Sequence, residues 1–473
     1  MSDNSSGKEI TVPPIADELG RVFAGEGFEL HLVGGPVRDA VLRRSVSDLD
    51  FTTDARPEAT EAILRANCST VWTTGADFGT IGGMFRGEQV EVTTFRADAY
   101  DRVSRNPIVR YGDSLVDDLE RRDFTVNAMA VSLPGHAFAD PFGGLADIAR
   151  QTIRTPASPE SSFADDPLRM LRAARFAAQL GFAVDPDTLD AMRRMAPELA
   201  RITAERIRDE FSKLMLAPDP VVGLRILIDT GLAEQFLPEL PALRMEIDEH
   251  AQHKDVYEHS LQVLRNAIAL ETAGPDLLLR LAALLHDIDK PETKDVVPGG
   301  VTFHHHDVAG ARLARRRMRD LRYPKADVQA VSLLISLHLR FYGYGDAGWT
   351  DSAVRRYVTD AGAQLDRLHL LVRSDCTTRN RRKAERLRRD YDAFEDRIAR
   401  IRAEEDLRAV RPDLDGNAIM ALLGLGPGPE VGRAWAHLKE LRLERGPMPR
   451  EEAESELLAW AAREGIGPRQ DAG

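Results

Sequence analysis

The sequence predicts an α+β protein with a mixed α/β domain at its N-terminus and an all-helical remainder. Strand-like segments such as 28–33 alternate with helical segments such as 15–26 and 57–68 near the start of the chain. From residue 186 onward the pattern is helical, with breaks at prolines. The chain has 473 residues, which is too long for one compact core, so three or more domains are expected.

The composition is that of an ordinary globular protein, with 43% hydrophobic and 29% charged residues. We find no apolar run long enough for a membrane span, and the first residues lack a signal-peptide pattern. Cys68 and Cys376 offer no disulfide framework, which suits a cytoplasmic protein. The net charge of -13 argues against a protein that coats nucleic acid, although a local basic groove remains compatible with it.

The segment Ser47-Asp48-Leu49-Asp50-Phe51 has the alternation of a half-buried strand. Leu49 and Phe51 would face a core, and Asp48 and Asp50 would project together from the other face. Two adjacent carboxylates repel each other, so a divalent cation between them is favoured over two bare charges. Hard oxygen ligands favour Mg²⁺.

A glycine pair precedes this strand. The predicted strand 28–33 runs into Gly34-Gly35, and Pro36 suits the first position of a following helix. Backbone N–H groups at such a helix start can bind an anion. A simple tight turn is the alternative, but the Asp-Leu-Asp segment that follows makes the anion site more specific.

Glu91 is a candidate third carboxylate. The segments 80–85 and 89–96 predict a hairpin in which Val90 and Val92 share one face and Glu91 occupies the other. A solvated strand residue is the alternative interpretation of Glu91.

A basic segment follows further along the chain. Arg121 and Arg122 stand directly before Asp123-Phe124-Thr125, where guanidinium groups could neutralise phosphate.

The segment 165–176 predicts a helix opened by Asp165-Asp166-Pro167, with Asp166 and Arg169 on one face. Arg172 and Arg175 continue this stripe. An acceptor beside a forked donor can recognise the edge of a base, although a surface ion pair is the simpler alternative.

Four of these segments together resemble the bacterial class II tRNA nucleotidyltransferase and poly(A) polymerase family. They are GGPVRD, SDLDF, RRDFTVNAMA and DDPLRMLRAARF, in the order of that family. Asp165 stands where the family usually has Glu. The resemblance implies a nucleotidyltransferase head at 15–155, a neck and body at 156–245, an HD domain at 246–378 and a helical tRNA-binding tail at 379–466.

The resemblance also implies roles for individual residues. Asp48 and Asp50 would be catalytic and would hold two Mg²⁺ ions, with Glu91 as a further candidate ligand. Asp166 and Arg169 would act as an amino-acid template that accepts CTP and ATP. The residues implied to bind nucleotide are Gly34, Gly35, Arg38, Arg122, Asp123, Asn127, Asp166, Arg169, Arg172 and Arg175.

Histidines concentrate in the second half of the chain, and their order resembles the HD phosphohydrolase domain. The core ligands carried over from it are His259, His286, Asp287 and Asp375. His305, His306 and His338 are candidates for a second ion. Imidazoles with carboxylates suit a divalent transition metal or Mg²⁺. The HD domains of this family are active phosphohydrolases in some members and structural in others.

The expected function is template-independent addition of CCA to tRNA from CTP and ATP, as in the actinobacterial branch of the family. One alternative is a poly(A) polymerase or an enzyme that adds only A. Another is an HD phosphohydrolase whose head only binds nucleotide, which the complete head motifs disfavour. The basic segment 379–389 is either an RNA contact or a solvated helix face. The sequence leaves the oligomeric state open.

Overall fold

The computed structural model of the chain describes residues 10–45, 49–76, 79–97, 110–112, 114–244, 255–297, 300–303, 305–343, 349–377, 380–404 and 412–467. The chain forms two compact units, Met1–Pro238 and Glu239–Gly473. The sequence predicts a boundary between 245 and 246. Glu239, at the start of unit 2, forms an ion pair with Arg317 of the same unit (Oε1 to Nη2, 2.6 Å). The finer domain boundaries stay predictions.

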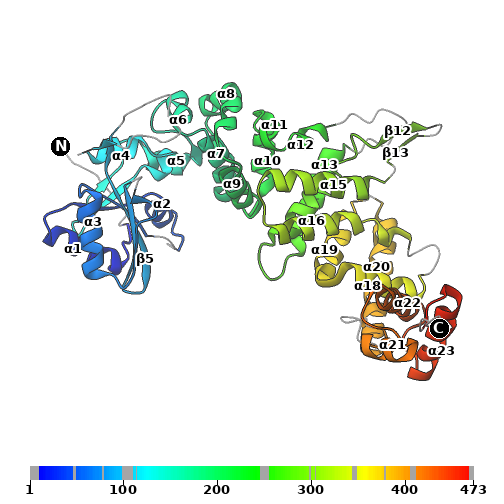
Figure 1. The fold of residues 1–473 in the computed structure, drawn as a ribbon. Coiled ribbons are helices and arrows are strands. Elements are labelled where there is room, and N and C mark those ends of the chain that lie inside the picture. Colours follow the sequence, from blue (N-terminus) through cyan, green and yellow to red (C-terminus); the bar gives the residue numbers. More distant parts are fainter. Residues whose placement is uncertain are drawn as a thin grey trace. The chain divides into compact units, whose positions relative to one another are not determined.

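The head of unit 1 is built on one mixed sheet, with helices α1 (Pro14–Gly25) and α3 (Pro57–Asn67) against it (Figure 1). Its strand order is β3-β4-β5-β2-β1-β8-β9, and β2 and β5 are its parallel neighbours. The strands are β1 (Leu30–Val33), β2 (Leu49–Thr53), β3 (Val71–Trp72), β4 (Thr80–Phe85), β5 (Glu88–Thr94), β8 (Ala130–Leu133) and β9 (Phe138–Ala139).

The predicted alternation along β2 is confirmed for the residues that the structure describes. Leu49 and Phe51 are buried, and Asp50 between them is half-buried on the opposite face. The predicted hairpin is also present. It turns at Arg86 and Gly87, both with positive φ, which suits the twist of paired strands.

The helices of unit 1 surround this sheet and extend beyond it as a helical neck. They are α2 (Gly35–Val41), α4 (Leu115–Glu120), η2 (Thr125–Asn127), α5 (Gly144–Arg150), α6 (Pro159–Asp165), α7 (Leu168–Leu180), α8 (Pro186–Met195), η3 (Ala196–Arg201), α9 (Ala204–Met215), α10 (Pro220–Asp229) and α11 (Ala233–Phe236). Helix α7 packs against both α9 and α10.

The prediction of one helix over 165–176 is wrong in its first turn. Asp165 ends α6, and Asp166 is extended, with φ -140° and ψ 99°. A residue that precedes proline is pushed out of the helical region, so α7 begins only at Leu168, after Pro167. Asp166 and Arg169 therefore do not share a helix face.

Unit 2 is mostly helical. Its elements are α12 (Glu239–Ala242), α13 (Val256–Leu270), α14 (Leu277–Leu285), α15 (His306–Asp320), α16 (Lys325–Leu337), η4 (Arg340–Gly343), α18 (Asp351–Ala361), η5 (Gly362–Gln364), α19 (Leu365–Asp375), α20 (Arg381–Glu404), α21 (Gly416–Leu423), α22 (Pro429–Arg445) and α23 (Arg450–Glu464). None of the described helices has the length and apolar character needed to cross a bilayer.

Three short strand pairs lie outside the main sheet. They are β6 (Arg96–Ala97) with β7 (Arg110–Tyr111), β10 (Thr152–Ile153) with β11 (Ala183–Val184), and β12 (Lys294–Val297) with β13 (Gly300–Phe303). The predicted fold class holds, but the part that follows the head is mostly helical rather than all-helical.

Candidate active site and metal centre

Asp50 on β2 and Glu91 on β5 lie side by side. The parallel register pairs their Cα positions, so both side chains leave the same face of the sheet, and both are half-buried. Neighbouring strands are about 4.8 Å apart, which is a distance that one bound cation can bridge. Asp48 lies outside the described residues, so its pairing with Asp50 stays a prediction.

The glycine loop faces the same place. Gly34 precedes α2 with φ 74° and ψ -134°, a conformation that requires glycine. A Cβ at Gly34 would lie 3.2 Å from Nη1 of Arg122 and 4.0 Å from Oδ2 of Asp50. The loop, Arg122 and Asp50 therefore enclose one small space. Helix α2 begins at Gly35, so Pro36 occupies its second position rather than the predicted first.

Arg122 has an unsatisfied donor at this place. Its Nη2 donates to Oδ2 of Asp118 at 3.2 Å. Its Nε is buried and has no hydrogen-bond acceptor among the described residues. An unpaired buried N–H is costly, and a phosphate oxygen would satisfy it.

A series of hydrogen bonds orients three further residues that the sequence predicts to bind nucleotide, Arg38, Asn127 and Asp123. Arg38 donates to both carboxylate oxygens of Asp39, at 2.9 Å each, and to Oδ1 of Asn127 at 2.8 Å. Asn127 in turn donates to Oδ1 of Asp123 at 3.0 Å. The guanidinium of Arg38 also lies over the ring of Phe176 on α7, 5.3 Å from its centre.

This series of hydrogen bonds continues from the head into α7 and α9 of the neck. Arg172 on α7 donates to Oδ2 of Asp123 through Nε and Nη2, at 2.9 and 2.6 Å. Glu210 on α9 accepts from Arg172 at 3.4 Å and from Arg175 at 2.6 Å. Burial raises the pKa of Asp123, but Arg172 and Asn127 outweigh it and hold that pKa far below its usual range.

In this structure the two residues of the predicted template pair make hydrogen bonds to different partners. Asp166 accepts from the backbone N–H of Leu168 at 3.1 Å and from Arg206 at 2.7 Å. Arg169 donates to Oγ of Ser162 at 2.8 Å and, through its other nitrogen, to the carbonyl oxygen of Arg121 at 2.5 Å. Both side chains remain at least partly accessible in the neck, but each has a different partner.

Sequence reasoning missed two residues of this region, Arg206 and Glu210. Both lie on α9 four residues apart, and they therefore face the same side. That spacing in AERIRDEF was the available signal. It indicates a shared face but not that the face lies against α7.

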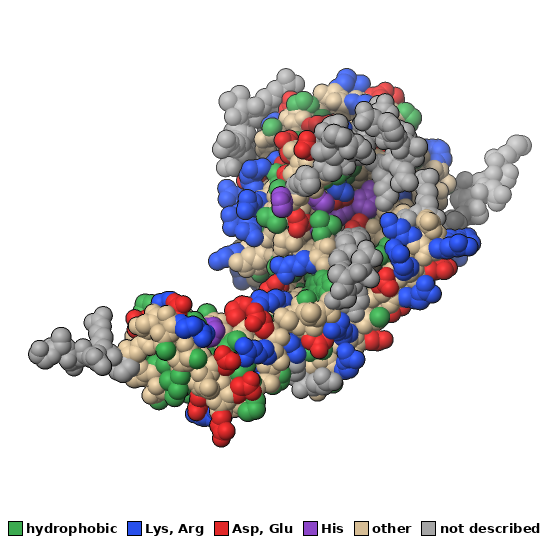
Figure 2. Space-filling view, turned by 90° about the vertical axis from the view of Figure 1, so that its right-hand side faces the viewer, with side chains coloured by type: hydrophobic (Ala, Val, Ile, Leu, Met, Phe, Trp, Pro, Cys, Tyr) green, Lys and Arg blue, Asp and Glu red, His purple; other side chains and the backbone are tan. Residues whose placement is uncertain are grey.

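Unit 2 holds a compact cluster of imidazoles and carboxylates, and Figure 2 shows histidine side chains gathered on the face seen there. Its residues lie on α13, α15 and α19 and directly after the ends of α14 and α16. Two groups, each with ligand atoms within 4.8 Å of one another, make up the cluster: His259, His286 and Asp375, and Asp287, His306 and His338.

Asp287 lies between the two groups. Its Oδ2 is 3.2 Å from Nε2 of His286 and 3.4 Å from Nε2 of His259. Its Oδ1 is 3.4 Å from Nε2 of His306. Lys290 donates to Oδ2 at 2.6 Å. This carboxylate can therefore be shared by two cations, one in each group.

Backbone contacts set the tautomer of three rings. Nδ1 of His286, His306 and His338 lies 2.9, 2.9 and 2.6 Å from the carbonyl oxygen three residues earlier. Because a carbonyl only accepts, each Nδ1 carries a proton, so Nε2 is the atom of each ring that can present a lone pair to a metal ion.

The donor set fits a divalent metal. Nε2 of His338 is buried without a hydrogen-bond partner among the described residues, and burial lowers the pKa of His338 to about 4. Burial would raise the pKa of Asp287 and of Asp375, but the neighbouring imidazoles hold both well below the usual range. Burial would lower the pKa of His286, but Asp287 and Asp375 outweigh it and raise that pKa, so a bound cation would take the place of the proton on this ring. Imidazole nitrogens and ionised oxygens converge on one place, as a metal site requires.

His305 does not join the cluster. It is exposed, has a positive φ of 59° and caps the start of α15, and neither group of described residues includes it. With His305 in the left-handed conformation, the next residue, His306, is the one that is buried in the cluster. His304 lies outside the described residues.

Comparisons with known proteins agree with this arrangement. Residues 30–154 match the family described as the poly A polymerase head domain. Residues 181–243 match the probable RNA and SrmB-binding site of polymerase A, and residues 256–380 match the HD domain.

An A-adding tRNA nucleotidyltransferase of Deinococcus radiodurans is 34% identical over 438 residues, which cover 91% of this chain and 95% of that protein. The CCA-adding enzyme of Lactobacillus johnsonii is 39% identical over 219 residues, which are 46% of this chain and 53% of that enzyme. The solved Bacillus stearothermophilus CCA-adding enzyme in complex with CTP superposes with a TM-score of 0.67 at 25% identity, over 96% of this chain and 99% of that one.

A nucleotidyltransferase head with an RNA-binding segment and an HD domain defines the class of protein. The chain belongs to the bacterial class II family of tRNA nucleotidyltransferases, which includes the CCA-adding enzymes. The comparisons do not assign it to the actinobacterial branch.

Substitution of Gly34 by Ala should reduce nucleotide incorporation by about 10- to 100-fold, because the strained φ and the contact with Arg122 cost roughly 1–3 kcal/mol. The measurement is steady-state incorporation of labelled nucleotide into tRNA. Gly35→Ala is the matched comparison, since its Cβ would meet Arg38 at an ordinary 3.7 Å. Equal losses in the two variants would contradict the assignment.

Metal content offers a second test. The protein is dialysed against Mn²⁺ and then against buffer, and His338→Ala should retain fewer ions per mole than wild type because one group of unit 2 loses a ligand. His305→Ala is the control and should match wild type. Elemental analysis per mole of protein measures both. Equal loss in His305→Ala, or full retention in His338→Ala, would refute the ligand set.

Proposed function

We propose that this protein adds C, C and A to the 3′ end of tRNA from CTP and ATP, with release of pyrophosphate. The observation that carries the proposal is the meeting of Gly34, Asp50 and Arg122 in a head of the nucleotidyltransferase family. A helix start, a carboxylate and an arginine are the groups that a nucleoside triphosphate needs.

Asp48, Asp50 and Glu91 are the proposed magnesium ligands. When bound, Mg²⁺ lowers the pKa of the attacking 3′-hydroxyl and stabilises the leaving pyrophosphate. Arg122 offers its buried Nε–H to a phosphate oxygen. Arg38 is pre-oriented by Asp39 and Asn127, so little conformational entropy is lost when it binds phosphate.

Base selection is assigned to Asp166 and Arg169, with Arg206 as a positioning residue. Arg206 fixes the carboxylate of Asp166, and Ser162 fixes the guanidinium of Arg169. A base with a donor and acceptor edge could bind between these two groups by exchanging hydrogen bonds with them. CTP and ATP present such edges, and the protein then needs no nucleic-acid template.

A second candidate function, addition of A alone, has its own support. The relative from Deinococcus radiodurans that adds A aligns over 91% of this chain. The CCA-adding relative from Lactobacillus johnsonii aligns over 46% of it. A solved structure that resembles this chain over 96% of its length is a CCA-adding enzyme with CTP, and this favours CCA addition.

The HD cluster supports an accessory phosphohydrolase activity with a divalent transition metal. His259, His286, Asp287 and Asp375 are the proposed ligands of one ion, and His306 and His338 with Asp287 those of another. We place both activities in the cytoplasm, because tRNA is the proposed substrate and two cysteines, Cys68 and Cys376, far apart in the sequence, provide no disulfide framework.

Incubation with tRNA that ends at its discriminator base tests the proposal. The protein should add two C with CTP alone and CCA with both nucleotides, resolved on a sequencing gel. Asp50→Asn should lower incorporation by roughly 1000-fold or more, because a neutral amide holds a divalent cation poorly. His286→Ala is the control and should retain incorporation. Tailing with ATP alone, without use of CTP, would support A-only addition instead.

A further inference from the structure

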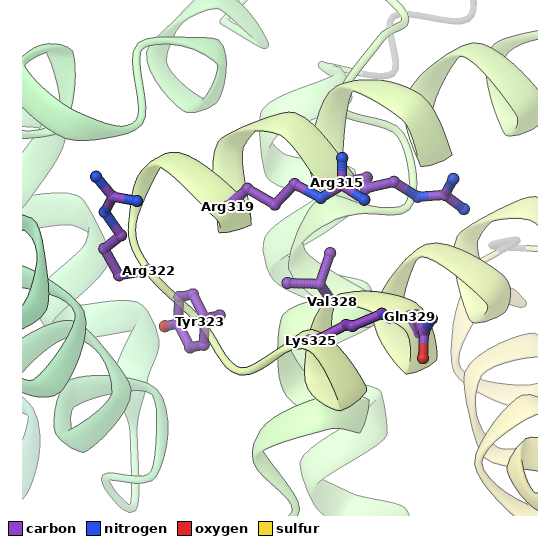
Figure 3. Close-up of a pocket in the computed structure, with 7 residues that line it drawn as sticks. All are labelled: Arg315, Arg319, Arg322, Tyr323, Lys325, Val328 and Gln329. Carbon is purple, nitrogen blue, oxygen red and sulfur yellow. The ribbon is translucent and has the colours of Figure 1, made fainter.

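A basic cavity of 540 Å³ lies between α15 and α16 in unit 2, away from the residues of the histidine cluster. Figure 3 shows Arg315 and Arg319 extending from α15 and Lys325 at the start of α16, with Arg322 on the turn between the helices. These four cations surround a floor that includes the buried Tyr323.

No acidic side chain is among the described residues that line this cavity. Within the described part of the chain, Arg319 and Lys325 form no ion pair. Arg315 donates to the hydroxyl of Ser332, which is neutral and leaves its charge uncompensated. By contrast, Arg317 on the same helix is neutralised by Glu239. Like charges around one space repel each other, and a polyanion relieves that repulsion.

The turn keeps Arg322 in place at some cost. Its φ is 61°, in the left-handed region where a helix usually ends with glycine. The N–H groups of Arg322 and Tyr323 donate to the carbonyls of Arg319 and Met318, at 2.9 Å each, and close the end of α15. A charged residue therefore occupies a position at the cavity where glycine would be less strained.

We propose that this cavity binds phosphates of the RNA backbone, and that it holds the body of the tRNA during addition. The inference rests on the proposed function, which supplies the polyanion. Guanidinium groups bind phosphate oxygens in pairs, and the aromatic and apolar floor suits the intervening ribose. A chain with net charge -13 needs local basic sites to hold such a substrate. The cavity lies outside both segments, 156–245 and 379–466, where the sequence predicts RNA contacts.

The test compares the binding of tRNA lacking its 3′ CCA by wild type and by Arg319→Glu/Lys325→Glu, across a series of salt concentrations. The cavity variant should bind at least 10-fold more weakly, and its log–log salt slope should fall by about 2, because two phosphate contacts are lost. Arg265→Glu/Arg316→Glu is the control, since it changes the net charge equally at exposed positions outside the cavity. It should keep the wild-type slope.

Equal weakening in both variants would show a long-range charge effect and overturn the inference. Inorganic pyrophosphate is the second probe, since it shares the phosphate chemistry. If the cavity variant binds fewer pyrophosphate ions per mole than the wild type, while tRNA affinity is unchanged, the cavity is a small-anion site and the inference also fails. A thermal melt checks that both variants fold, and Arg319→Gln/Lys325→Gln should give an intermediate loss. Failure of the wild type to extend tRNA would instead contradict the proposed function, whatever the cavity binds.

Discussion

The buried charge of Asp123 is the constraint on which the arrangement of unit 1 depends. A carboxylate that is only 8% exposed must be compensated, and here Arg172, Asn127 and the backbone N–H of Phe124 do so. Those partners come from the head and from α7 of the neck. One buried charge therefore ties the glycine loop, through Arg38 and Asn127, to the helix that carries the remaining arginines.

Unit 2 also contains a buried carboxylate, and its charge is compensated by different groups. Asp287 is 1% exposed, and its neighbours are Lys290 and three imidazoles whose Nε2 atoms lie 3.2–3.4 Å from its oxygens. The buried carboxylate of the head is compensated by arginine, which stays charged at any physiological pH. The carboxylate charge in the histidine cluster is balanced by imidazoles and Lys290, and a divalent cation could replace the imidazole protons. The two centres thus differ in chemistry as well as in position along the chain.

Local pattern was sufficient for much of the fold. Alternation predicted β2 and the hairpin of β4 and β5, and the resemblance to HD domains predicted the six residues that the structure brings together in the histidine cluster. The errors arise where a neighbour in sequence decides the outcome. Pro167 removes Asp166 from the helix, and the left-handed turn at His305 directs His306 inward instead. Contacts between distant segments, such as Arg206 with Asp166, could not be predicted because helical spacing does not reveal which helix packs opposite.

The central claim is that Asp123 and Arg172 act as one unit in shaping the nucleotide site. A double-mutant cycle on CTP affinity, measured by calorimetry for Asp123→Asn, Arg172→Met and the double variant, tests it most directly. Each single change should weaken binding, and the double variant should be hardly weaker than either, with a coupling energy of about 1–3 kcal/mol. Additive losses would contradict the account, because they would mean that the two residues contribute to nucleotide binding independently.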